Sequence, residues 1–182
     1  MPAAICFTDH ADVTAIIRRR KEETLRCWAF HIMEQEGGVG IENKKVFIFR
    51  GVPGSGKSSL GETVVELALM AGLSAAQFEA DQYFTDANGK YSFAIDKIKE
   101  AHEDCFRHFC EAIDSAMHVV VLSNTSSQEW EFRRYKEYAE EKGYIVFVSV
   151  VEHRHGNGDV HNINPEVRKR MIDNLKTSFK PW

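Results

Sequence analysis

The alternation of apolar and polar segments after residue 43 predicts an α/β fold. Short, nearly continuous apolar runs recur along the chain, and each is followed by a longer segment with apolar residues at helical spacing. Such apolar runs are typical of strands buried on both faces, and the periodic segments are typical of amphipathic helices. Strands that alternate with helices form a parallel sheet with helices on both faces. We therefore predict an open parallel sheet of four or five strands, flanked by helices and joined by right-handed crossovers.

The same pattern divides the chain into a helical extension and one domain. The predicted strands are KVFIF at 45–49, SAAQFEAD at 74–81, HVVVLSNT at 118–125 and YIVFVSVV at 144–151. The predicted helices cover 57–72, 94–117, 128–142 and 165–179. Residues 9–36 also have helical spacing, and a glycine-rich linker follows them. We predict an N-terminal helical extension over 1–43 and a kinase-like domain over 44–182, with a lid loop before its last helix.

The composition of the chain mainly argues against certain classes of protein. A chain of 182 residues fits one compact domain, and its net charge of −4 gives no overall basic signal for nucleic acid. The four cysteines form no CxxC pair, which predicts reduced thiols in a reducing compartment. The N-terminal residues do not resemble a signal peptide, and no apolar run reaches the length of a membrane span. We expect a cytoplasmic protein, or a nuclear one by diffusion, whose oligomeric state the sequence leaves open.

The segment GVPGSGKS, Gly51 to Ser58, has the pattern of a phosphate-binding loop. It matches G-x-x-x-x-G-K-[ST], and it lies between a predicted strand and a predicted helix, as this motif requires. Glycines let the backbone curl so that its N–H groups face phosphate oxygens at the positive end of a helix. We expect the Lys57 ammonium to contact the β- and γ-phosphates of ATP, and the Ser58 hydroxyl to ligate Mg²⁺. The predicted nucleotide-binding residues are Val52, Pro53, Gly54, Ser55, Gly56, Lys57, Ser58 and Ser59.

Two absences narrow the class of nucleotide-binding protein. The N-K-x-D segment with which GTPases read guanine does not occur. The most apolar predicted strand ends in Ser123 and Asn124, where motor ATPases usually carry an acidic metal ligand. Both observations favour a small phosphotransferase.

The segment FEADQYF places Asp81 at the carboxyl end of the second predicted strand. Strand ends form the ligand crevice of an open parallel sheet. A carboxylate there can accept a proton from an attacking hydroxyl, and it can also hold Mg²⁺ through water. Glu79 shares its face and is a weaker candidate. The alternative is that Asp81 only caps the turn after the strand.

Several further segments carry a family resemblance. RGVPGSGKSSL, EADQYF, GKYSF and AHEDC occur in this order, followed by LSNTSSQEWEFRRY, KGYIVFVSVVE and HGNGDVHNINPEVRKRM. Over about residues 44–179, the chain resembles the polynucleotide-kinase-like group of P-loop phosphotransferases. The D-x-Y-F, N-T-x-x-x-x-E and H-N-I-x-P pieces are more specific than the phosphate loop, which many families share.

The resemblance implies transfer of the ATP γ-phosphate to a 5′-hydroxyl of DNA or RNA. It implies that Asp81 is the general base and that Lys57 and Ser58 contact the phosphates and Mg²⁺. Asn124 and Thr125 would line the cleft near the γ-phosphate or the attacking hydroxyl. Capping of the helix near Gln128 is the alternative, above all for Thr125.

The chain departs from the family at its arginines. The phage enzyme of this group has an arginine shortly after its catalytic aspartate, and Phe84 stands at the matching place. The family lid also carries arginines, whereas the segment HRHGNGDVHNINP has only Arg154. An arginine here would stabilise negative charge on the transferring phosphoryl group. We assign this role to Arg154, with Arg168 or Arg170 of the last helix as alternatives.

The predicted lid and the aromatic residues complete the candidate site. A histidine-rich metal site in the lid is one alternative, but its spacing matches no closed zinc pattern. We favour a lid that excludes water, with His161 and Asn162 as polar contacts to the substrate. Tyr83 is the best candidate to stack a terminal base, whereas core packing is expected for Phe93.

Three functions follow. The first is a polynucleotide 5′-hydroxyl kinase that uses ATP and Mg²⁺ and has a nucleic-acid end as its partner. The second is a kinase of a small hydroxyl-bearing metabolite or nucleoside, which would share Asp81 and the loop. The third is a non-catalytic ATP-binding module, suggested by the missing arginines and the non-acidic end of the third strand.

Overall fold

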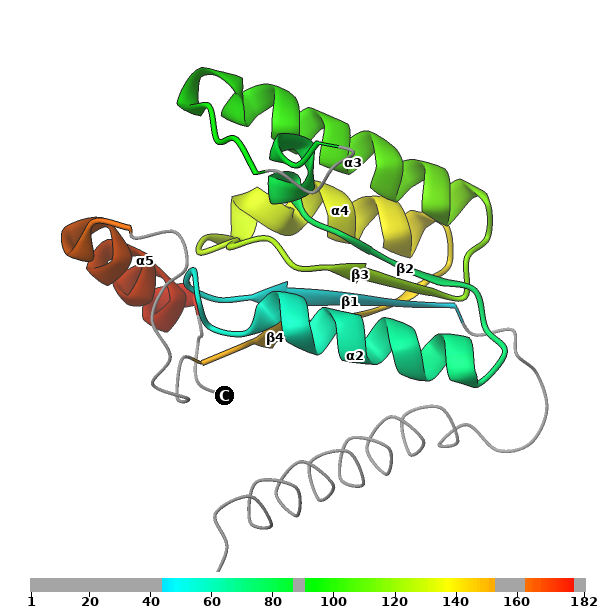
Figure 1. The fold of residues 1–182 in the computed structure, drawn as a ribbon. Helices are drawn as coiled ribbons and strands as arrows, with labels where there is room; N and C mark the ends of the chain where they lie inside the picture. The colour runs from blue at the N-terminus through cyan, green and yellow to red at the C-terminus, as the bar shows by residue number, and fades with distance from the viewer. Residues whose placement is uncertain (1–43, 87–90, 153–162, 179–182) are drawn as a thin grey trace, which may run out of the picture. The chain divides into compact units, whose positions relative to one another are not determined.

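Four parallel strands form the sheet. The structure is a computed structural model that describes residues 44–86, 91–152 and 163–178, so the predicted N-terminal helix lies outside the described residues. The strands are β1 (Lys45–Arg50), β2 (Ala75–Phe78), β3 (Val119–Leu122) and β4 (Ile145–Val150), in the order β2-β3-β1-β4 (Figure 1). All three strand pairs are parallel, and β1 pairs with both β3 and β4. The predicted open parallel sheet flanked by helices is therefore confirmed.

Helices cover both faces of this sheet. The α-helices are α2 (Lys57–Met70), α3 (Ile98–Asp114), α4 (Glu129–Glu141) and α5 (Pro165–Ser178), and two short 3₁₀ helices are η1 (Ala80–Phe84) and η2 (Ile95–Lys97). Helix α2 lies on one face of the sheet, and α3 and α4 lie together on the other (Figure 1). The chain after β1 thus crosses one face, whereas the chain after β3 crosses the opposite face.

The core lies mainly between the sheet and the pair α3 and α4. All four residues of β3 are at most 2% exposed, which explains why its sequence is uniformly apolar. Phe109 of α3 and Tyr135 of α4 pack edge to face with ring centroids 5.1 Å apart, and both rings are almost fully buried. Tyr135 thus packs α4 into the core, whereas Trp130 at the start of α4 is 66% exposed.

The second strand is shorter than the sequence predicts. Strand β2 ends at Phe78, and Asp81 lies on η1 instead of at a strand terminus. The Glu79 side chain caps this turn, and the Gln82 side chain accepts a hydrogen bond from the Glu79 backbone N–H at 3.4 Å. This capping box favours a helical turn over continued extension. The predicted helix 94–117 likewise begins as η2 and becomes α-helical only at Ile98.

Candidate active site

The site lies where the ends of β1, β2 and β3 meet. In an open parallel sheet, the crevice forms between neighbouring strands whose following helices lie on opposite faces. Strands β1 and β3 meet this condition, since α2 and α4 cover opposite faces. The two loops that leave these strands are joined directly, because the Gly51 N–H donates to the Thr125 carbonyl oxygen at 3.0 Å.

The loop after β1 has the geometry of a phosphate cradle. Gly54 and Gly56 have φ angles of +75° and +94°, a region that favours glycine. A Cβ atom on Gly51 would lie 2.5 Å from the Val151 carbonyl oxygen, so only glycine fits there. The Lys57 side chain is 7% exposed, and its Nζ donates to the Val52 carbonyl oxygen at 3.0 Å. The ammonium group is therefore held within the curve of the loop.

Two buried hydroxyl groups at this place have no protein partner. Among the described residues, the Oγ atoms of Ser55 and Ser123 are buried and make no hydrogen bond. Ser55 is 2% exposed and lies in the cradle, and Ser123 is 4% exposed at the end of β3. Buried hydroxyls are normally satisfied, so an unpaired one indicates a missing partner. Phosphate oxygens of ATP would supply such partners in the curve of the loop.

Helix η1, which carries Asp81, is attached to the end of β3. The Asn124 Oδ1 atom accepts a hydrogen bond from the Ala80 N–H at 2.8 Å, and its Nδ2 atom contacts the Cys105 Sγ atom at 3.7 Å. Both ends of the Asn124 amide are thus engaged within the protein, and the residue is only 8% exposed. Asn124 thus sets the position of η1, a contact that its place in the sequence did not reveal.

The Asp81 side chain is exposed at the surface of η1. Its carboxylate is close enough to Tyr91 to act on that phenol: desolvation raises the pKa of Tyr91, and the charge of Asp81 adds to the effect. Phe84, which directly follows Tyr83, is 6% exposed and belongs to the core. An arginine in place of Phe84 would be buried among apolar side chains. Phe84, which stands where the phage enzyme has an arginine, therefore packs in the core of this chain.

Exposed aromatic rings surround Phe84. Tyr83, Tyr91 and Phe93 pack around its ring with centroid distances of 5.4, 6.3 and 5.0 Å. Their exposed fractions are 38%, 43% and 49%. The expectation that Phe93 is a core residue was therefore wrong. The Tyr83 hydroxyl donates to Glu100 Oε2 at 3.0 Å, which holds this ring at the surface.

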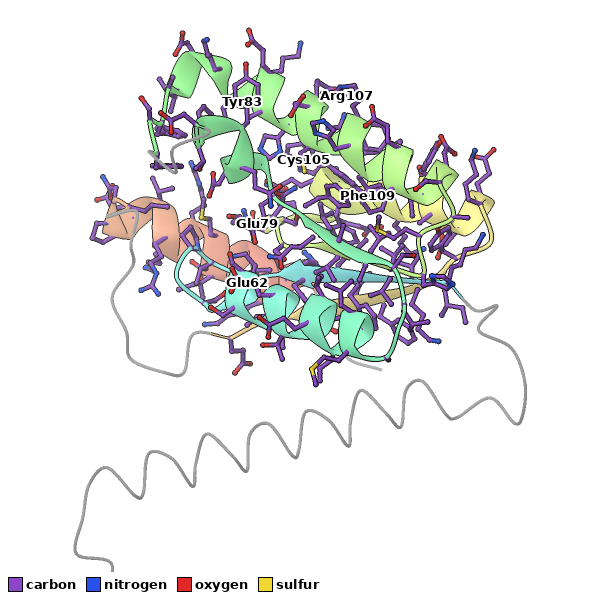
Figure 2. The ribbon with its side chains drawn as sticks, turned by 45° about the vertical axis from the view of Figure 1, so that its right-hand side comes forward. Glu62, Glu79, Tyr83, Cys105, Arg107 and Phe109 are labelled. Atoms are coloured by element: carbon purple, nitrogen blue, oxygen red, sulfur yellow. The ribbon has the colours of Figure 1, made fainter. Side chains whose placement is uncertain are left out.

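Glu79 and Gln77 form a polar array against the start of α2. The Gln77 Nε2 atom donates to the Ser58 carbonyl oxygen at 3.2 Å and to Glu79 Oε1 at 2.5 Å. Burial raises the pKa of Glu79, and hydrogen bonds from the Ser58 and Gln77 side chains oppose this change. Figure 2 shows Glu79 beyond β2, near the part of α2 that Glu62 marks. The Ser58 hydroxyl and this carboxylate fit the oxygen ligands that Mg²⁺ prefers.

Arg50 joins the ends of β1, the β3–α4 loop and α5. Its guanidinium donates to the carbonyl oxygens of Ser126 at 2.8 Å and Ser127 at 3.1 Å, and to the Ser178 hydroxyl at 3.0 Å. It also lies 4.5 Å from the ring centroid of Phe132. The side chain is only 4% exposed, and burial lowers its pKa. A charged residue directly after an apolar strand was the only sequence signal for this role.

The residue that caps the start of α4 differs from the one that the sequence suggests. The N-cap of α4 is Gln128, which forms a capping box with Glu131. The capping alternative for Thr125 is therefore wrong, and its backbone instead binds Gly51. The basic side chains of α4 are engaged in surface ion pairs. The pairs are Arg133 with Glu129, Arg134 with Glu103 and Lys136 with Glu140.

The remaining predicted residues fall into two groups. Arg154, His161 and Asn162, with the rest of the histidine-rich loop, lie outside the described residues. Arg168 is half-buried on α5, and its Nε atom is buried and unpaired within the described part of the chain. Cys105 and Cys110 are free thiols, as predicted, and burial raises the pKa of each. In residues 44–86, 91–152 and 163–178, no three His, Cys, Asp or Glu side chains gather as a metal cluster, and no helix is suited to crossing a membrane.

Comparison with known proteins gives a distant relative. No family model matches the chain. The chain is 28% identical over 136 residues to human NEDD4-binding protein 2, an alignment that covers 71% of the chain. It spans only 7% of the length of that relative.

Comparison with solved structures gives matches of low sequence identity, with TM-scores below 0.5. A mutant of the Mycobacterium tuberculosis APS kinase CysC is 22% identical, with a TM-score of 0.46, covering 74% of this chain and 98% of the other. Chaetomium thermophilum Kti12 in complex with ADP-AlF3 is 12% identical, with a TM-score of 0.47, covering 71% and 79%. A chain of the Pnkp1/Rnl/Hen1 complex is 12% identical, with a TM-score of 0.47, and the match covers 71% of this chain and 46% of the other. The sheet order and the glycine-rich loop between β1 and α2 give the chain the P-loop NTPase/kinase fold.

Proposed function

We propose that the protein is an ATP-dependent phosphotransferase that moves the γ-phosphate of ATP to the 5′-hydroxyl end of a polynucleotide. One observation carries the proposal. The phosphate loop after β1 and the carboxylate of Asp81 are held at one edge of the sheet, because Asn124 fixes η1 to the end of β3. A nucleotide and an acceptor hydroxyl could then meet between Lys57 and Asp81.

The loop residues would hold the nucleotide. Backbone N–H groups of the loop residues after Pro53 and the Lys57 ammonium would bind its phosphates, and the unpaired Ser55 hydroxyl would donate a further hydrogen bond. Ser58 would hold Mg²⁺ directly and Asp81 through water. Bound Mg²⁺ would supply positive charge that neutralises the phosphate oxygens.

Asp81 would act as the general base. Its carboxylate would accept the proton of the acceptor hydroxyl as the bond between that oxygen and the γ-phosphorus forms. The bond from the γ-phosphorus to the bridging oxygen breaks, and ADP leaves with that electron pair. Lys57 would remain on the phosphates through this step. Thr125 would line the cleft, and Arg154, His161 and Asn162 would close it as lid residues.

The exposed aromatic rings beside Asp81 support an acceptor that carries a base. Tyr83 and its two aromatic neighbours around Phe84 leave much of their ring surface open. Bases stack on such rings without a strong sequence preference, at about 1–3 kcal/mol for each base. We assign the stacking of the terminal base to Tyr83.

An acidic pocket supports a second candidate, a kinase of a small acceptor. A pocket of about 520 Å³ lies between Tyr83 and α3. Glu100, Glu103 and Asp104 line it together with Arg107, and Arg107 already pairs with Asp104. This negative surface would repel a phosphate backbone. A nucleoside or another neutral hydroxyl compound would meet no such repulsion.

Transfer from γ-labelled ATP separates the two candidates. The wild-type chain would be incubated with 5′-hydroxyl DNA and RNA oligonucleotides and, separately, with nucleosides, with Lys57→Met as the inactive control. The proposal predicts label on at least one oligonucleotide and none with Lys57→Met. Label on nucleosides alone would support the small-acceptor kinase. ATP binding without transfer to any acceptor would contradict both.

A further inference from the structure

The array of Gln77, Glu79 and Ser58 is built to hold a carboxylate at the phosphate loop. Gln77 Nε2 bonds both Ser58 and Glu79, so one amide ties the end of β2 to the first turn of α2. The Ser58 side chain also hydrogen-bonds the Glu79 carboxylate. Glu79 in turn caps η1, so its backbone and side chain are both fixed. The carboxylate is thereby held beside the hydroxyl that the proposed function assigns to Mg²⁺.

A helix glycine makes room for this array. Gly61 is buried within α2, and a Cβ atom there would lie 2.6 Å from the Gln77 Oε1 atom. A glycine inside a helix costs about 0.5–1 kcal/mol relative to alanine. The Oε1 atom itself is buried without a partner in the described part of the chain. Both costs are explained if the Gln77 amide must lie here to orient Glu79.

The end of β3 supplies no carboxylate of its own. In other P-loop proteins an aspartate from such a strand completes the Mg²⁺ site with the serine of the loop. Here the strand ends in Ser123, whose Oγ is buried and unpaired, and in Asn124, whose amide is engaged by Ala80 and Cys105. At the end of β2, in contrast, hydrogen bonds join the Glu79 carboxylate to Ser58 and Gln77.

We infer that Glu79 is the acidic residue that supports magnesium binding at Ser58, and that Gln77 is its positioning residue. Glu79, just after β2, would thus do what an aspartate at the end of β3 does in other P-loop proteins. This inference rests on the proposed function, since it concerns the same nucleotide site. It adds Glu79 to the magnesium site beside the water-mediated contact of Asp81, and it leaves to Asp81 the role of general base.

The test is the coupling between Mg²⁺ and nucleotide affinity, which requires no turnover. The affinity for ADP would be measured by isothermal titration calorimetry in EDTA and in saturating MgCl₂, and the ratio of the two constants gives the coupling. In Glu79→Gln the coupling should fall about 10–100-fold, as for residues that support metal ligands. ADP affinity in EDTA should not weaken, because the variant loses a negative charge near the phosphates. Glu66→Gln, an exposed glutamate farther along α2, should keep the wild-type ratio.

Two further variants guard against a folding defect. Glutamine at residue 79 retains a capping acceptor, and circular dichroism would check the fold. Glu79→Asp should retain part of the coupling, and Gln77→Met should lose part of it, because Glu79 loses its amide donor. Unchanged coupling in folded Glu79→Gln would overturn the inference and leave the proposed function standing. Failure of the wild-type chain to bind ADP with or without Mg²⁺ would overturn the proposed function and the inference together.

Discussion

The backbone N–H of Ala80 donates a 2.8 Å hydrogen bond to the Asn124 side chain, and this bond joins η1 to the end of β3. Asp81 follows Ala80 directly, so the position of the proposed base depends on an amide from another strand. The amide of Asn124 also contacts Cys105 of α3. Three elements therefore fix the proposed base through one buried side chain.

Asn124→Ala should impair both stability and transfer. The variant leaves the Ala80 N–H buried without its acceptor, at a cost of about 1–3 kcal/mol in the free energy of unfolding. Urea denaturation would measure this loss, and single-turnover transfer should slow because Asp81 is no longer held in place. Asn174→Ala, on a half-buried residue of α5, is the control. Wild-type transfer by a folded Asn124→Ala variant would show that η1 does not need this bond.

Gly51→Ala should weaken nucleotide binding more than it lowers the stability of the domain. The added Cβ would lie 2.5 Å from the Val151 carbonyl oxygen and 2.6 Å from Ser55 Oγ, so the loop must shift. Calorimetry with ADP should show at least a tenfold weaker affinity, about 1.4 kcal/mol. Gly143→Ala is a matched control. Gly143 has a φ of +80°, which also disfavours alanine, but it lies before β4, at the end of the sheet opposite to the phosphate loop. Equal ADP affinity in the two variants would contradict the assignment of the loop after β1 as a phosphate cradle.

Arg50→Lys should destabilise the domain although it conserves the charge. Lysine cannot reproduce the three hydrogen bonds to Ser126, Ser127 and Ser178 with the flat geometry of a guanidinium. We expect a loss of about 2–3 kcal/mol in the free energy of unfolding. Arg133→Lys, on an exposed ion pair with Glu129, should change it by less than about 0.5 kcal/mol. If both variants unfold at the wild-type urea midpoint, Arg50 does not join these elements.

Acid should weaken the contact between the ends of α3 and α4. Hydrogen bonds from Lys142 and Tyr138 hold the pKa of Asp114 below its usual value of 3.8. A lowered pKa in the folded state gives stability that is present above the unfolded value and lost as pH falls through the folded one. Wild type should therefore exceed Asp114→Asn in urea midpoint at pH 7, and the difference should shrink below about pH 3.8. Asp173→Asn is the control, and a difference independent of pH would contradict this assignment.

The sequence predicted the fold well because its strongest signals are local. A strand of valines and leucine, a glycine-rich loop and four helical periodicities each determine their own conformation, and all of them recur in the structure. The site was harder to predict from the sequence because it depends on contacts between distant segments. Asn124 and Ala80 are 44 residues apart, and Arg50 and Ser178 are 128 apart. No pattern within one segment reveals such pairs.

The errors have the same origin. Asp81 was expected at a strand end because SAAQFEAD has strand character, but the capping box and Asn124 favour a helical turn there. Phe93 was expected in the core because it is apolar, yet Phe84 fills the core and leaves Phe93 on its outer side. Gln77 was overlooked because one polar residue in a strand is unremarkable until its contacts with Ser58 and Glu79 are seen.

The most direct test of the proposed function is single-turnover transfer from labelled ATP by wild type, Asp81→Asn and Asp96→Asn. Asp96 is an exposed acid on η2 and serves as the matched control. We predict that Asp81→Asn binds ATP as well as wild type but transfers phosphate about 10²–10⁴-fold more slowly, as expected on loss of a general base. Asp96→Asn should transfer at the wild-type rate. Transfer by Asp81→Asn at the wild-type rate would contradict the assignment of Asp81 as the base.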